Sequence, residues 1–138
     1  MKYSDTLLDT IYDRTSGKCH ICGKKLARLN YGLLDARGSW EVEHSIPVAR
    51  GGTDHANNLF AACISCNRSK RDSTSRSARA HHGRSRAPYS SAQIKKVRTG
   101  NAISGGVIAG IATLIFAPEL FLVGAIAGAL VGYEINVE

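Results

Sequence analysis

The apolar positions near the start of the chain recur at helical spacing. They form one stripe, made of Leu7, Leu8, Ile11 and Tyr12. This stripe predicts an amphipathic helix over residues 4–15, which packs against the rest of a small domain. Ser4 or Asp5 can cap the first turn of this helix with a side-chain oxygen, and Gly17 suits its end.

From residue 39 to residue 46 the apolar positions recur with a period of two, which predicts a β-strand. One face of this strand carries Trp40, Val42, His44 and Ile46, and the other carries Glu41, Glu43 and Ser45. Pro47 is expected to end the strand, because proline cannot donate to a β-ladder. A loop, a short second strand and a short helix are then predicted, over residues 47–57, 58–62 and 65–73.

Two uncharged segments stand near the end of the chain, over residues 102–117 and 120–133, and Pro118-Glu119 separates them. Glycines recur at every fourth position within these segments. They are Gly106 and Gly110 in the first segment, and Gly124, Gly128 and Gly132 in the second. This spacing places the glycines on one helix face and predicts an apolar, glycine-rich helical hairpin.

A membrane is the expected partner of residues 102–133, although each segment is shorter than the roughly twenty residues of a typical membrane-spanning helix. The hairpin would therefore insert shallowly or thin the bilayer locally. Basic residues precede the first segment, which predicts that the N-terminal part stays on the cytoplasmic face of the membrane. The alternative is that the glycine-rich helices pack on the N-terminal domain or self-associate.

The net charge of +7 is concentrated in one part of the chain. Residues 68–98 carry ten Lys/Arg and one acid, whereas the remainder of the chain has a net charge of −2. Over residues 74–100, Ser, Arg, His and Ala dominate and apolar residues are sparse. This composition predicts a flexible basic linker that attracts nucleic acid or an anionic membrane, or that serves as a solvated spacer. His81-His82 within it is an alternative metal-binding pair.

Four cysteines form two Cys-x-x-Cys pairs, Cys19/Cys22 and Cys63/Cys66. Two pairs with this spacing predict a site where four thiolates bind one zinc ion. His20 could replace a thiolate, and two disulfides or redox pairs are the other interpretation. No secretory signal is visible at the start of the chain, which favours a reducing compartment and therefore zinc.

The stretch from Trp40 to Lys70 carries the most specific chemistry. Glu43 and Asn67 offer the oxygens that a hard divalent ion binds, and His44 can act as a base. Strict alternation sends Glu43 and His44 to opposite faces, so the strand must twist or end there if both meet one phosphate-metal centre. These residue types together predict phosphodiester hydrolysis by an activated water. Three basic residues are expected to contact nucleic acid: Arg68, Lys70 and Arg71.

This order of residues resembles the HNH endonucleases, in which a ββα-metal finger cuts nucleic acid. The resemblance covers about residues 10–72, including YDRTSGKCHICGKKL and WEVEHSIPVARGGTDHANNLFAACISCNRSK. It implies a small α+β, treble-clef-like domain stabilised by zinc. It implies that His44 is the general base and that Asn58 orients the catalytic loop through backbone hydrogen bonds. It also implies that Glu43 and Asn67 bind the catalytic Mg²⁺, Mn²⁺ or Ni²⁺.

The chain departs from the commonest family pattern at two positions. Glu43 stands where aspartate is common, and Asn67 stands where histidine is common, but both offer oxygen ligands. The expected organisation is an HNH domain over residues 1–73 that cuts DNA, the linker over residues 74–100 and the apolar tail over residues 101–138. Two alternatives are a zinc finger that binds DNA without cutting it and a membrane-acting protein whose tail is the effector.

Overall fold

The structure of the chain, a computed structural model, describes residues 2–116 and 121–134. It divides into two compact units, residues 1–91 and residues 92–138.

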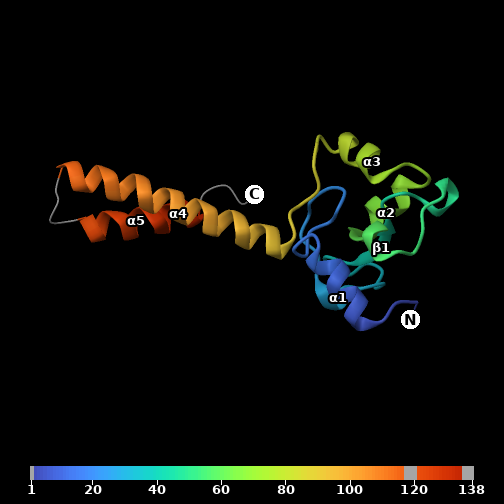
Figure 1. Cartoon of the computed structure of the whole chain (residues 1–138). Coiled ribbons are helices and arrows are strands. Elements are labelled where there is room, and N and C mark those ends of the chain that lie inside the picture. Colours follow the sequence, from blue (N-terminus) through green and yellow to red (C-terminus); the bar gives the residue numbers. More distant parts are fainter. Residues whose placement is uncertain (1, 117–120, 135–138) are drawn as a thin grey trace. The chain divides into compact units, whose positions relative to one another are not determined.

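The described part of the first unit contains three short α-helices and one two-stranded sheet (Figure 1). The helices are α1 (Asp5–Asp13), α2 (Ile64–Lys70) and α3 (Ser75–His81), together with the first residue of α4. The strands β1 (Trp40–His44) and β2 (Leu59–Cys63) pair in antiparallel register, from Trp40 opposite Cys63 to His44 opposite Leu59. Three 3₁₀ turns lie in the loops, at Arg28–Asn30, Val48–Arg50 and Ala56–Asn58. The predicted small α+β architecture is confirmed, with strand, loop, strand and helix in the expected order.

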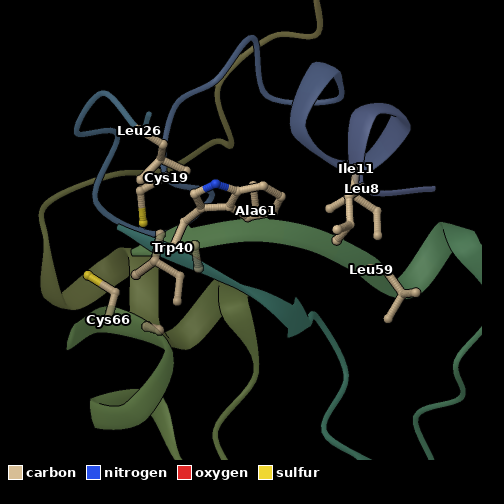
Figure 2. Close-up of a cluster of buried hydrophobic side chains, with 11 residues drawn as sticks. Leu8, Ile11, Cys19, Leu26, Trp40, Leu59, Ala61 and Cys66 are labelled. Atoms are coloured by element: carbon tan, nitrogen blue, oxygen red, sulfur yellow. The ribbon is translucent and has the colours of Figure 1, made fainter. Parts of the chain in front are cut away.

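The core of this unit lies between α1 and one face of the sheet (Figure 2). Leu8 and Ile11 of α1 are buried, as the helical stripe predicts, and the Ser4 side chain accepts a hydrogen bond from the Leu7 amide at 3.3 Å. Trp40 is fully buried among these residues, and its indole nitrogen donates to the Arg28 carbonyl at 3.3 Å. A buried indole with a satisfied N–H supplies much of the apolar area in so small a core.

The two faces of β1 have different environments, because consecutive side chains of a strand point in opposite directions. Trp40 and Val42 belong to the apolar core, whereas Glu41 and Glu43 lie on the other face, where α2 packs against β1. β1 ends at His44. His44 is still paired with Leu59, and the convergence of Glu43 and His44 on one metal-phosphate centre stays a prediction.

The structure differs from the predicted flexible linker over residues 74–100. Residues Ser75–His81 form α3, capped by the Thr74 side chain, and Ser91–Phe116 form α4. Ser75 and Ala78 of α3 are buried. Composition misses this helix because it buries only two small side chains, and basic or small residues occupy its other positions.

The second unit contains α4 from residue 92 onward and α5 (Phe121–Glu134), which run side by side (Figure 1). A Cβ added at Gly106 would lie 3.2 Å from the Ala125 carbonyl oxygen, so glycine permits this close approach. The Arg98 guanidinium lies 5.2 Å from the centre of the Tyr133 ring. The predicted turn at Pro118-Glu119 lies outside the described residues.

Among the helices that the structure describes, none is both long enough and apolar enough to cross a membrane. Membrane association through residues 102–133, self-association of the glycine-rich helices and the location at the cytoplasmic face of a membrane stay predictions.

Substitution within α3 distinguishes a packed helix from a flexible linker. Ala78→Asp should lower the free energy of unfolding by about 2–4 kcal/mol, because it places a carboxylate in a buried position without a partner. Ala80→Asp, at an exposed position of the same helix, should change it by less than about 0.5 kcal/mol. Urea denaturation of both variants measures the difference, and equal stabilities would show that α3 is not packed.

Candidate active site and zinc centre

The four cysteines gather at the end of the sheet. Their sulfur atoms all lie within 4.8 Å of one another. Cys19 and Cys22 belong to a tight turn in which the Cys19 amide donates to the Lys24 carbonyl at 2.8 Å, and Gly23 has a φ of +78°. Cys63 ends β2 and Cys66 lies in α2. The cluster therefore joins three segments of the first unit, and four thiolates at this separation fit a tetrahedral zinc ion.

Electrostatics within the cluster favour a bound cation. A hydrogen bond with the Cys19 thiol lowers the pKa of Cys63 to about 4. Burial, and then the hydrogen bond with Cys63, raises the pKa of Cys66 to about 12. Without a cation, neighbouring sulfurs cannot all carry negative charge, so these pKa values move in opposite directions. A zinc ion removes this conflict, because it binds thiolates and not thiols.

The alternative histidine ligands are not part of the four-cysteine cluster among the described residues. His20 is buried, stacks on Phe60 at 3.9 Å between ring centres, and contacts the Arg79 guanidinium through Nε2 at 2.7 Å. Burial and the neighbouring Arg79 lower the pKa of His20 to about 3, so its imidazole is neutral and accepts this hydrogen bond. His82 is exposed, and its Nε2 lies 3.5 Å from the Cys66 sulfur. His82 therefore contacts a cysteine of the cluster without being one of its four sulfur ligands.

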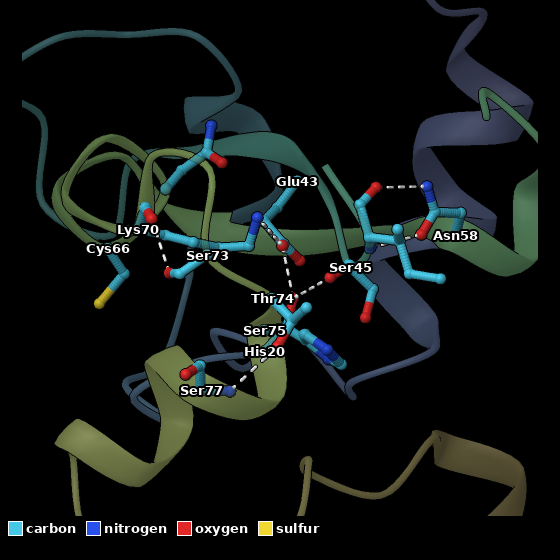
Figure 3. Close-up of polar contacts among 12 residues, drawn as sticks. His20, Glu43, Ser45, Asn58, Cys66, Lys70, Ser73, Thr74, Ser75 and Ser77 are labelled. Carbon is cyan, nitrogen blue, oxygen red and sulfur yellow. Dashed lines mark hydrogen bonds and ion pairs between the residues drawn. The ribbon is translucent and has the colours of Figure 1, made fainter. Parts of the chain in front are cut away.

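Glu43 is completely buried on the face of β1 opposite the core (Figure 3). Its Oε1 accepts a hydrogen bond from the Ser75 hydroxyl at 2.5 Å and lies 3.2 Å from the Lys70 ammonium. Its Oε2 is buried and has no hydrogen-bond partner among the described residues. Burial raises the pKa of the Glu43 carboxyl, while Ser75 and Lys70 oppose this shift. One carboxylate oxygen is thus held by the protein and the other is left for a further ligand.

The position of Lys70 corrects a prediction. We expected Lys70 to contact nucleic acid, but its side chain is 4% exposed and its ammonium is paired with Glu43. Lysine rarely becomes buried without a partner, and the buried carboxylate of Glu43 supplies one. Arg68 and Arg71 remain exposed.

Asn67 lies against the same face of β1, but its direct partner is Glu41. The Asn67 amide nitrogen donates to Glu41 Oε2 at 3.0 Å, and the Arg68 guanidinium donates to Glu41 Oε1 at 3.0 Å. No hydrogen bond joins Asn67 to Glu43 among the described residues. Because the nitrogen of the Asn67 amide is the atom that contacts Glu41, the amide oxygen is the atom suited to a metal ion.

His44 has separate partners from those of Glu43. Its Nε2 lies 2.7 Å from Oδ1 of Asp54, a residue of the loop between the strands. The hydrogen bond with His44 lowers the pKa of the Asp54 carboxyl. A carboxylate can only accept hydrogen bonds, so Nε2 carries a proton, and in the neutral imidazole Nδ1 is then the basic nitrogen. The loop therefore orients the imidazole of His44.

Asn58 fixes the loop that carries Asp54 (Figure 3). Its side-chain oxygen accepts from the Ile46 amide at 2.7 Å, and its side-chain nitrogen donates to the carbonyls of Ile46 and Thr53, each at 2.9 Å. Gly52 allows this closure, because a Cβ there would lie 1.8 Å from the Ile46 carbonyl oxygen. Asn58 thus acts on backbone groups and holds the two ends of the loop together.

The oxygen atoms of Glu43 and Asn67 fit a divalent metal ion. Hard cations prefer carboxylate and amide oxygens, and Glu43 Oε2 is a buried carboxylate oxygen without a hydrogen-bond partner among the described residues. Glu43 and Asn67 would hold such an ion, with Glu41 beside them.

Comparison with known proteins agrees with this arrangement. The sequence model of the HNH endonuclease family matches residues 19–73, which include all four cysteines and the whole of β1. The chain contains an HNH endonuclease domain. Over 58 residues it is 36% identical to EcoKMcrA of Escherichia coli strain K12, a type IV methyl-directed restriction enzyme. That stretch is 42% of this chain and 20% of the relative, so the chain spans about a fifth of that enzyme. No solved structure gives a significant match to the chain.

Three residues of the HNH domain and its surroundings escape the sequence argument. Glu41 contacts Asn67, Asp54 contacts His44, and Ser75 contacts Glu43. The period of two along β1 already places Glu41 on the face of Glu43, so this residue could have been found. Asp54 lies in a loop, and Ser75 lies beyond the family match. At neither position does sequence spacing predict a contact.

The HNH domain should contain one zinc ion per chain, bound by the four cysteines. Removal of zinc with a chelator should unfold residues 1–91, because so small a core depends on metal binding for much of its stability. Cys22→Ser should weaken zinc binding and lower the melting temperature. Elemental analysis with circular dichroism checks this, and a zinc-free protein with an unchanged melting temperature would contradict it.

Proposed function

We propose that this chain is a metal-dependent endonuclease that hydrolyses phosphodiester bonds in DNA. The observation that carries the proposal is the buried, half-satisfied carboxylate of Glu43, which directly precedes His44 in the sequence of an HNH domain. A restriction enzyme among the relatives of the chain supports DNA as the substrate. Exposed Arg68 and Arg71 are suited to contact its phosphates.

In this proposal His44 is the general base. Asp54 accepts a hydrogen bond from the Nε2–H group of His44, so Nδ1 is the atom that takes a proton from the attacking water. Asn58 holds the loop of Asp54 through its three hydrogen bonds to backbone groups, and in this way it keeps the imidazole oriented. Asn58 is therefore a positioning residue.

Glu43 and Asn67 bind the catalytic divalent ion, which can be Mg²⁺, Mn²⁺ or Ni²⁺. When bound, such an ion reduces the negative charge of the phosphate and stabilises the leaving oxygen. Ser75 and Lys70 hold Glu43 Oε1, which would leave Oε2 as the ligand atom for such an ion. Such partners of a metal ligand fix its orientation and commonly determine the affinity for the metal.

A zinc-containing module that binds DNA without cutting it is the second candidate. The complete burial of Glu43 and its ion pair with Lys70 favour it, because both are typical of a structural charge pair. This candidate gives no reason for the hydrogen bond between His44 and Asp54. Nuclease activity of the purified chain separates the two.

The full-length protein should convert supercoiled plasmid to nicked or linear DNA when Mg²⁺, Mn²⁺ or Ni²⁺ is added. His44→Ala should reduce the rate by about 10²–10⁴-fold, the usual contribution of a general base, while DNA binding is retained. His81→Ala, at an exposed histidine of α3, is the matched control and should leave the rate unchanged. Full activity of His44→Ala would refute the assignment of the base.

Asn67→Ala should instead weaken the binding of the divalent ion. We expect the Mn²⁺ concentration for half-saturation to rise by about tenfold, because a metal ligand is lost. Titration followed by the electron paramagnetic resonance of free Mn²⁺ measures this without DNA. Asn57→Ala, at an exposed position of the 3₁₀ turn Ala56–Asn58, is the control. If Asn67→Ala and the wild-type protein bind Mn²⁺ equally, Asn67 is not a ligand.

A further inference from the structure

A hollow of about 470 Å³ opens on the surface of the first unit, between the segment that follows the first cysteine pair, the loop that precedes β1 and the start of α2. Three cationic side chains line it, and Asp35 is its one acidic residue. The cations are Lys24, Lys25 and Arg68. An excess of positive charge in a concave site favours an anionic ligand.

Apolar side chains form another part of the wall. Leu34 is 61% exposed and Ile64 is partly buried, and both border the hollow. The hydroxyl groups of Ser39 and Ser65 lie among them. A ligand with a flat apolar face, polar edges and an attached phosphate matches this combination. The volume is that of a small-molecule site and too small to admit a double helix.

The hollow is connected to the proposed active site through Glu41. Arg68 lines the hollow and binds Glu41 Oε1, while Asn67, a proposed metal ligand, binds Glu41 Oε2. A DNA strand whose scissile phosphate lies near Asn67 would therefore bring a neighbouring nucleotide to the hollow. Only an unpaired nucleotide could enter, because a paired base is held within the stack.

We propose that this hollow binds one unpaired nucleotide of the DNA substrate. This inference rests on the proposed function of the chain. Lys24 and Lys25 contact its phosphate, and Leu34 packs against the face of its base. Arg68 stays on Glu41 and adds positive charge. The hollow thus selects DNA with a bulged or extruded nucleotide beside the cleavage site.

Fluorescence anisotropy with three duplexes of one sequence tests this proposal, using the full chain without added Mg²⁺. The first duplex is fully paired, the second has one bulged thymidine, and the third has a bulged abasic residue, which keeps the phosphate but lacks the base. The wild-type protein should bind the thymidine bulge about tenfold more tightly than the abasic bulge, because only the base buries apolar surface. Equal affinity for these two bulges would overturn the proposal.

Variants locate the effect in the hollow. Leu34→Ala should remove most of the preference for the thymidine bulge, whereas Leu29→Ala, at a leucine that is 88% exposed and outside the hollow, should retain it. Circular dichroism and zinc content check that each variant is folded. An unchanged preference in a folded Leu34→Ala protein would overturn the proposal.

The lysines need a charge-matched control. Lys24→Ala/Lys25→Ala should weaken binding of both bulged duplexes by about tenfold and lower the salt slope by about two. Lys95→Ala/Lys96→Ala removes an exposed lysine pair outside the hollow and should leave the ratio between bulged and paired DNA unchanged. If Lys24→Ala/Lys25→Ala weakens all three duplexes equally, these lysines form a general basic surface, and the nucleotide site is refuted.

A free nucleotide is the other source of the same chemistry. Displacement of the bulged duplex by thymidine monophosphate at a concentration similar to that of the DNA would assign the hollow to free nucleotides and overturn the proposal. These binding measurements use uncut DNA, so their outcome is independent of whether the chain cleaves plasmid.

Discussion

The convergence of four cysteine sulfurs within 4.8 Å is the constraint on which the rest of the first unit depends. The sheet has only two strands of five residues each, and a two-stranded sheet of this size is marginally stable by itself. The cysteines come from the tight turn after α1, the end of β2 and α2. A metal ion at this point would fix where α2 begins, and therefore which of its residues face β1. Asn67 follows Cys66 directly and comes to lie against Glu41.

The strand β1 serves two environments because its side chains alternate. One face buries Trp40 in the core, and the other buries Glu43 between α2 and α3. Burying a carboxylate is costly unless charged and polar partners surround it. Lys70 and Ser75 meet this need at one oxygen and leave the other without a partner among the described residues. Ser75 lies beyond the family match, so α3 contributes to the environment of a residue inside it.

The sequence predicts α1, β1, β2 and α2 to within a few residues. The apolar stripe of α1 and the alternation of β1 are visible directly, and the spacing of the cysteines predicts their cluster. α3 could not be predicted, because only Ser75 and Ala78 are buried in it. Lys70 was misassigned to nucleic-acid binding because its burial depends on Glu43, a contact that spans 27 positions of the chain.

We propose that zinc and a second divalent ion occupy different sites, one among the cysteines and one at Glu43. Anomalous diffraction from crystals soaked in Mn²⁺, recorded at the zinc and manganese edges, tests it most directly. The account predicts a zinc peak at the centre of the four sulfurs and a manganese peak adjacent to Glu43 Oε2 and the Asn67 amide. A manganese peak only at exposed carboxylates such as Asp54, with Glu43 still in contact with only Lys70 and Ser75, would contradict it.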